Sequence, residues 1–136
     1  MKTEFINKLL QTAIDEGNRL DVPITISIVD SGGHLVAVLR QENCSYFALE
    51  SSRKKAVTSS QLKVPSHVLG DVLIKFPELI KSLDNNKDIE LLAGGFPIII
   101  NNITIGGIGI AGGNFEQDRV IGECVIKMMN DLAAVL

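Results

Sequence analysis

The stretch that decides the fold is ITIGGIGIAGGN at residues 103–114. Isoleucines alternate there with small residues, a pattern typical of a buried strand in which glycine lets another element approach the backbone closely. The GxGxxG spacing at residues 107–112 also occurs in dinucleotide-binding proteins, but that site needs a parallel βαβ unit and an acidic residue on a second strand. Only a final helix follows here, so we interpret the glycines as packing positions on a central strand.

Turns, strands and helices extend outward from this strand. Asn101 and Asn102 suit a two-residue hairpin turn because asparagine tolerates positive φ, and Asn114 with Gln117 has the spacing of a helix capping box. Apolar periodicity predicts strands over residues 24–29, 35–39, 89–93, 96–100 and 103–111. It predicts helices over residues 4–18, 46–61, 65–74 and 77–83 and from 114 onwards, with a polar loop at 84–88. The helix over 46–61 carries a stripe of small residues: Ala48, Ser52, Ala56 and Ser59 or Ser60.

The connections between strands predict an antiparallel sheet. Short turns at residues 30–33 and 101–102 join neighbouring strands, whereas parallel strands would need crossover connections. The strands over 24–29 and 103–111 are the least polar, so we place them at the centre of the sheet with helices on both faces. The expected class is α+β, with five antiparallel strands in one domain over residues 1–136.

Composition disfavours several functional classes. The chain has 136 residues, a net charge of −3, 46% hydrophobic residues and 4% aromatic residues. Net acidity and the lack of Trp argue against nucleic-acid binding. No signal peptide and no apolar run of membrane-spanning length is visible, so we expect a cytoplasmic protein that does not contact the membrane. Cys44 and Cys124 are far apart, and no metal-ligand spacing occurs, so we expect no structural metal site.

Polar residues at the ends of the predicted elements form a candidate site. Asp30 ends the first strand, and Asp118 lies in the first turn of the last helix. We expect these aspartates to share one rim of the sheet with Lys55 and Thr58, which lie three residues apart on one helix face. Residues 112–114 would add backbone amides at a helix start, an environment that favours carboxylates and phosphates. The alternative is that Asp30 is an ordinary turn residue and Asp118 a partner of the helix dipole.

Three separated motifs resemble the GlcG/HbpS family. The first is IVDSGGHLVA at residues 28–37 with Arg40, and the second is RKKAVT at residues 53–58. The third consists of GGFPI at 94–98, IGGIGIAG at 105–112 and Gln117-Asp118. The resemblance covers essentially the whole chain. It departs from the family pattern after Arg40, where Gln41-Glu42-Asn43-Cys44 replaces the usual Asp-Gly-Ala.

The resemblance implies a profilin-like three-layer α/β/α sandwich with a five-stranded antiparallel sheet, and a homo-oligomer. The family includes haem-binding proteins, the C-terminal domain of PduO-type cobalamin adenosyltransferases, and proteins of glycolate and diol or glycerol operons. The PduO enzymatic activity is not expected here, since no adenosyltransferase domain precedes this one. The residues that we carry over to a ligand site are Asp30, Arg40, Lys55, Thr58, Gly112 and Asp118. Gly113 is added from its place at the helix start.

We therefore expect a protein that binds a small ligand, with haem or a related tetrapyrrole as the named candidate. Glycine-rich sheet surface would offer a slot, and the free amides near Gly113 with Lys54, Lys55 or Arg40 would meet the propionates. His67 or His34 would be the axial ligand. The alternatives are an enzyme or cofactor chaperone acting on a small carboxylate or hydroxy compound, and a purely structural subunit of an oligomer. We also expect an oligomer because the small-residue stripe and the outer strands would leave apolar surface uncovered.

Overall fold

The computed structural model describes residues 1–83 and 86–135. Its helices are α1 (Thr3–Arg19), α2 (Phe47–Leu62), α3 (Ser66–Ile74), α4 (Pro77–Leu83) and α5 (Phe115–Val135). Its strands are β1 (Thr25–Asp30), β2 (Leu35–Arg40), β3 (Gly95–Ile100) and β4 (Ile103–Ala111). The predicted polar loop at 84–88 lies partly outside the described residues.

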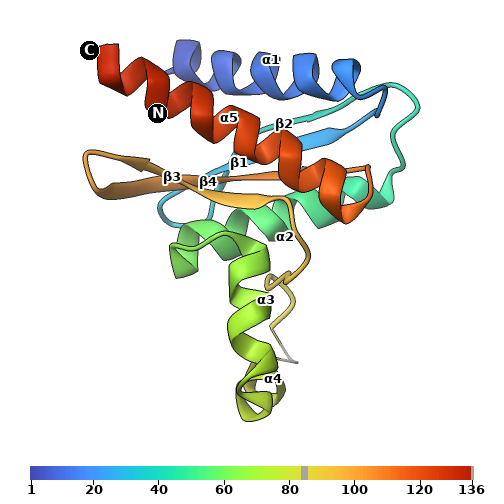
Figure 1. Cartoon of the computed structure of the whole chain (residues 1–136), viewed down its shortest axis with the longest axis vertical. Coiled ribbons are helices and arrows are strands. Elements are labelled where there is room, and N and C mark those ends of the chain that lie inside the picture. Colours follow the sequence, from blue (N-terminus) through green and yellow to red (C-terminus); the bar gives the residue numbers. More distant parts are fainter. Residues whose placement is uncertain (84–85, 136) are drawn as a thin grey trace.

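The strands form one antiparallel sheet in the order β2-β1-β4-β3. The prediction that β1 and β4 are central is confirmed. Helices α1 and α5 cover one face of the sheet and α2 covers the other, which gives three layers (Figure 1). The α+β class and the antiparallel sheet are therefore confirmed, whereas the fifth strand is not.

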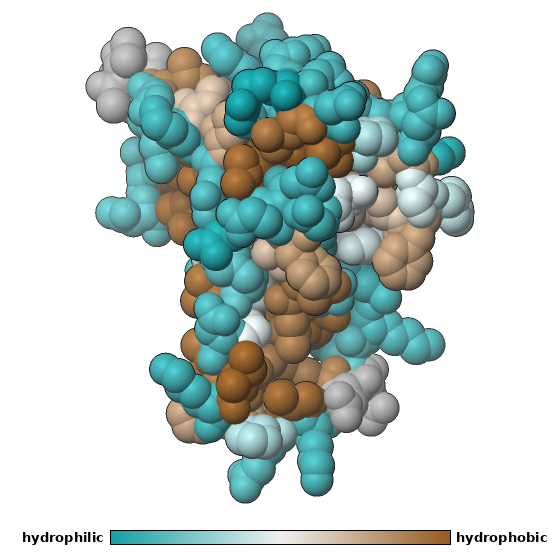
Figure 2. Space-filling view, turned by 45° about the vertical axis from the view of Figure 1, so that its right-hand side comes forward, coloured by the Kyte–Doolittle hydropathy of each residue, from teal (hydrophilic) through white to brown (hydrophobic). Residues whose placement is uncertain are grey.

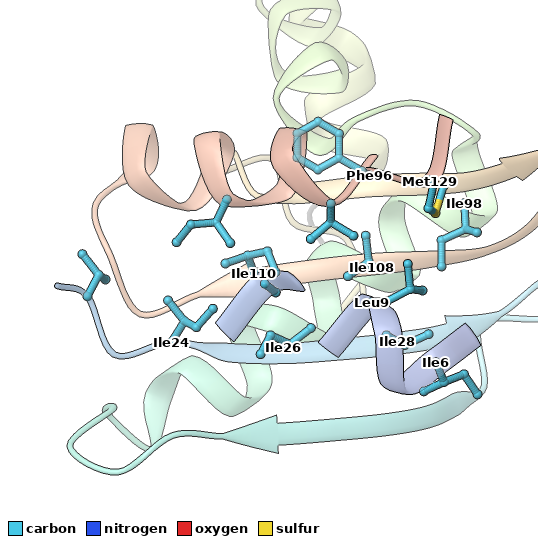
Figure 3. Packing of buried hydrophobic residues seen from close by; sticks show 14 residues of the cluster. Ile6, Leu9, Ile24, Ile26, Ile28, Phe96, Ile98, Ile108, Ile110 and Met129 are labelled. Carbon is cyan, nitrogen blue, oxygen red and sulfur yellow. The ribbon is translucent and has the colours of Figure 1, made fainter. Parts of the chain in front are cut away.

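The two faces of the sheet carry side chains of different size. Ile24, Ile26 and Ile28 point from β1 and its approach toward α1 and α5, and Ile108 and Ile110 continue this layer on β4. All five isoleucines are fully buried, and Figure 3 shows them packed beneath the helices. Burying one such side chain contributes about 1.5–3 kcal/mol, so this layer is the main source of stability.

The opposite face is lined by small residues, and α2 lies very close to it. A Cβ atom at Gly107 would overlap the carbonyl oxygen of Ala56, and one at Gly109 would overlap that of Ser52. The hydroxyls of Ser27 on β1 and Ser52 on α2 are 2.7 Å apart. The alternation along β4 thus places Gly107 and Gly109 against α2 and Ile108 and Ile110 against α1 and α5, in line with the packing role predicted for the glycines. The small-residue stripe of α2 is buried against the sheet, so it does not form the uncovered surface that we expected.

The predicted strand over residues 89–93 is absent, which leaves four strands among the described residues. Its backbone groups bond to side chains of two helices instead of to a neighbouring strand. The hydroxyl of Thr58 donates to the carbonyl of Asp88 at 3.1 Å and accepts from the amide of Glu90 at 2.9 Å. The hydroxyl of Ser66 donates to the carbonyl of Leu92 at 2.6 Å. The segment is therefore held to α2 and α3 as a loop.

The predicted local features at the ends of β4 are present. Asn101 and Asn102 have φ of 52° and 64°, as a two-residue turn with positive φ requires. At the start of α5, the amide of Gln117 donates to Asn114 Oδ1 at 2.8 Å, and the amide of Asn114 donates to Gln117 Oε1 at 2.9 Å. This reciprocal pair is the predicted capping box.

Helices α3 and α4 project from the sandwich on the side of α2 (Figure 1). Only Ser66 and Leu73 of α3 are buried, and α4 buries none of its residues. Ile74 is 74% exposed, Phe76 55% and Leu79 47%. We call residues 66–83 the α3–α4 arm.

Candidate functional site

Four of the predicted site residues line one small cavity where β4 ends and α5 begins. The cavity has a volume of about 200 Å³. We call it the Lys55 pocket; it is lined by Ser45, Phe47, Ala48, Ser51, Lys55, Leu92, Ala111, Gly112, Gly113, Phe115 and Asp118. The structure therefore brings Lys55, Gly112, Gly113 and Asp118 together, although they come from α2, the turn after β4 and α5.

A buried ion pair forms part of the wall of this pocket. The ammonium of Lys55 donates to Asp118 Oδ2 at 3.0 Å and to the carbonyl oxygen of Ile110 at 2.9 Å. Both residues are only 2% exposed. Burial raises the pKa of Asp118, and the Lys55 ammonium and the Gly113 amide offset only part of this effect. The carboxyl group of Asp118 therefore needs the nearby Lys55 ammonium to stay charged.

Two backbone amides at the start of α5 are engaged within the chain. The amide of Gly113 donates to Asp118 Oδ1 at 2.9 Å, and that of Asn114 donates to the capping side chain of Gln117. We expected the amides of residues 112–114 to be free for an anion, and the structure corrects this for Gly113 and Asn114. An anion that used the amide of Gly113 would have to displace the Asp118 carboxylate from it.

Two further predicted residues support the surroundings of the pocket without lining it. Thr58 holds the segment that leads to Leu92, through its bonds to Asp88 and Glu90. Arg40 donates to the carbonyl oxygen of Cys44 at 2.9 Å, and its guanidinium lies 5.7 Å from the centre of the Tyr46 ring. Arg40 thus braces the segment before α2, from which Ser45 and Phe47 reach the pocket.

Asp30 does not join the other predicted residues. In the β1–β4 register Asp30 pairs with Gly106, whereas Lys55 and Asp118 meet beside Ile110, four residues further along β4. At about 3.3 Å per residue this places them roughly 13 Å apart along the strand. Asp30 instead accepts the amides of Gly32 and His34, which lowers its pKa. It acts here as a turn residue, which is the alternative interpretation given above.

A second and larger cavity was missed by the sequence analysis. It has a volume of about 540 Å³ and lies between edge strand β3 and α5. We call it the β3–α5 groove; it is lined by Lys63, Pro65, Phe96, Pro97, Ile99, Ile100, Asn101, Asn102, Ile126, Met129, Asn130 and Ala133. The one sequence feature that pointed to this groove was Pro97 within an apolar run, because proline in a strand marks the edge of a sheet.

The two histidines have different environments. The imidazole of His67 packs edge-on against Phe96 of the groove, with ring centres 5.9 Å apart. Its Nδ1 atom is buried without a hydrogen-bond partner among the described residues, and burial lowers the pKa of His67. The side chain of His34 is 82% exposed beside Asp30. His67 is thus held in the neutral form, which is the form that ligates metals.

The described residues form neither a metal-ion cluster nor a membrane-spanning helix. Residues 1–83 and 86–135 contain no group of three or more His, Cys, Asp or Glu side chains arranged to hold a metal ion. None of the helices that the structure describes combines the length and apolarity needed to cross a membrane.

The fold is that of an α+β protein with an antiparallel sheet between helical layers, and it carries the two cavities described above. Residues 1–127 match the family described as haem degrading protein HbpS-like. The chain therefore belongs to the HbpS-like family, and the resemblance to GlcG and HbpS proteins is confirmed.

Individual relatives support this membership. An uncharacterised 15.0 kDa protein of Citrobacter freundii, from the dhaT-dhaS intergenic region, is 29% identical over 92% of this chain and 89% of its own length. Corrinoid adenosyltransferase PduO of Salmonella typhimurium is 30% identical over 92% of this chain, which spans only 38% of that protein. A solved PduOC:Heme complex is 30% identical, covers 96% of this chain and 95% of its own, and superposes with a TM-score of 0.86.

Proposed function

We propose that this protein binds haem or a related tetrapyrrole. The proposal is supported by membership in the HbpS-like family and by the similarity to the PduOC:Heme complex at 30% identity over nearly the whole of both chains. The observation that carries it within this chain is the β3–α5 groove, whose lining residue Phe96 contacts the imidazole of His67.

The groove suits the body of a tetrapyrrole. Its volume of about 540 Å³ lies within the range of about 300–1,000 Å³ that is usual for pockets holding larger organic ligands. Its walls are mostly apolar, with Phe96 and Met129 at 6% exposure and Ile99 and Ile100 on the open edge strand. A flat apolar macrocycle would remove this surface from water.

Polar groups near the groove would bind the propionates and the iron of haem. Lys63 lines the groove and would hold a propionate by charge. His67 contacts the groove residue Phe96, and its buried Nδ1 has no hydrogen-bond partner among the described residues, so His67 and not the exposed His34 would hold the haem iron. When bound, haem supplies an iron centre that can exchange electrons or hold a small ligand.

Titration of haem into the purified protein, followed at the Soret band, tests the proposal. We expect a saturable spectral change at micromolar haem with one equivalent per chain. The variant His67→Gln should alter the bound spectrum, while His34→Gln, the matched control, should keep the spectrum of the unmodified protein. A lack of saturation would contradict haem binding. An unchanged spectrum in His67→Gln would contradict the role of His67 alone.

A further inference from the structure

The Lys55 pocket is separate from the groove, and its chemistry differs. The two cavities share no lining residue, and the pocket volume of about 200 Å³ is too small for a tetrapyrrole. We propose that the Lys55 pocket binds a small uncharged hydroxy compound. This proposal is independent of haem binding in the groove.

The hydrogen-bonding capacity of the ion pair is not exhausted. An ammonium has three N–H donors, and that of Lys55 meets two acceptors among the described residues, Ile110 and Asp118. The carboxylate of Asp118 accepts one bond on each oxygen, and a carboxylate has about four lone-pair directions. The pocket therefore offers a donor and an acceptor on atoms that are 3.0 Å apart.

The charges on the pocket wall favour an uncharged ligand. The side chains of Lys55 and Asp118 are both 97% buried, and their opposite charges cancel. A carboxylate ligand would place a second negative charge beside Asp118, in a site where desolvating an unbalanced charge is costly. A hydroxyl group accepts from Lys55 and donates to Asp118 without adding charge.

The mouth of the pocket is apolar, which suits the carbon skeleton of such a compound. Phe47 is 80% exposed and Phe115 60% exposed, and both line the cavity. Ala48 lies on the same wall and is buried. The volume lies below the range of about 300–1,000 Å³ for drug-sized ligands, so the compound has only a few carbon atoms.

Blocking the pocket without touching the ion pair gives a direct test. Ser51 of α2 is half-buried and lines the cavity, so Ser51→Leu adds volume there, and Ser51→Ala is the matched control. Glycerol and hydroxyacetone are the uncharged probes, and glycolate is the charged one. Binding is followed by NMR at the amides of Gly112 and Gly113, with the melting temperature of each variant checked.

We expect saturable shifts of both amides with millimolar glycerol or hydroxyacetone in the unmodified protein and in Ser51→Ala. In Ser51→Leu these shifts should be lost while the Soret titration with haem is unchanged. Glycolate should bind about tenfold more weakly, a difference of about 1.4 kcal/mol. The proposal is overturned if neither uncharged probe saturates, if glycolate binds more tightly, or if Ser51→Leu binds the probes normally. Loss of haem binding in Ser51→Leu would show that the two sites are not separate.

Discussion

The side chains of Lys55 and Asp118 are 63 positions apart in the sequence and meet in a buried ion pair with Nζ and Oδ2 3.0 Å apart. Lys55 belongs to α2 and Asp118 to α5, which cover opposite faces of the sheet (Figure 1). The pair therefore ties the two helical layers together at the end of β4, where Gly94 leaves room for it. A Cβ atom at Gly94 would lie 3.1 Å from both Lys55 Nζ and Asp118 Cβ.

Removing one partner of this pair should be far more damaging than removing both. Lys55→Met leaves the carboxylate of Asp118 buried and unpaired, which typically costs about 3–5 kcal/mol. The double variant Lys55→Met with Asp118→Leu should recover most of that loss, since two apolar side chains of similar volume replace the pair. Urea unfolding of the single and double variants measures the difference. A single variant as stable as the unmodified protein would mean that the pair is solvated in solution.

The stability of the protein should fall with acidification because of His67. Burial lowers the pKa of His67 from its usual 6.5, so the unfolded chain binds more protons than the folded one as the pH drops below that value. The contribution of neutral His67 is therefore complete above pH 6.5 and is lost as the pH falls toward its lowered pKa. Urea unfolding at several pH values should show a weaker acid dependence in His67→Gln. The same dependence in that variant as in the unmodified protein would contradict the burial of His67.

Gly109 should not tolerate a side chain. A Cβ atom there would overlap the carbonyl oxygen of Ser52, so Gly109→Val must push α2 away from the sheet. Overpacking alone costs about 1–3 kcal/mol, and displacement of a backbone segment adds to it. Gly32→Ala is a suitable control, because a Cβ there would meet first the exposed imidazole of His34. Thermal melting compares the two, and a normal melting temperature in Gly109→Val would contradict the close packing of α2.

A homo-oligomer stays a prediction, and the structure changes its basis. The uncovered apolar surface lies on the α3–α4 arm and, as expected, on the outer strands β2 and β3, but not on the small-residue stripe of α2. Hydrophobic residues appear in brown over the lower part of the molecule in Figure 2, where the arm projects. Light scattering should give a mass above the 14.7 kDa of one chain, and Ile74→Glu with Leu79→Glu should lower it. A mass of 14.7 kDa for the unmodified protein at high concentration would refute the prediction.

Local sequence patterns predicted most of the fold because they act over a few residues. The Asn101-Asn102 turn, the capping box at Asn114 and the alternating glycines of β4 all function within their own segment or against one neighbour. The strand predicted over residues 89–93 failed for the opposite reason. Its backbone partners are the hydroxyls of Thr58 and Ser66, which no pattern within that segment reveals.

The candidate site was predictable in part. Lys55, Gly112, Gly113 and Asp118 meet because α2 packs on the end of β4, which the small-residue stripe indicated. The prediction that Asp30 shares this site failed because β1 and β4 are antiparallel, so the end of β1 lies beside the start of β4 and not beside its end. The β3–α5 groove depends on how α5 crosses an edge strand, and this tertiary relation has no local sequence signature.

Haem binding in the β3–α5 groove is tested most directly by a Soret titration of two matched variants. Ile99 lines the groove and is 42% exposed, whereas Ile103 is 65% exposed and lies outside it. Ile99→Asp places a charge against the macrocycle, and Ile103→Asp places the same charge elsewhere on the neighbouring strand. We expect haem affinity to fall at least about tenfold in Ile99→Asp, a loss of about 1.4 kcal/mol, and to be unchanged in Ile103→Asp. Equal haem affinity in both variants and the unmodified protein would contradict the groove as the binding site.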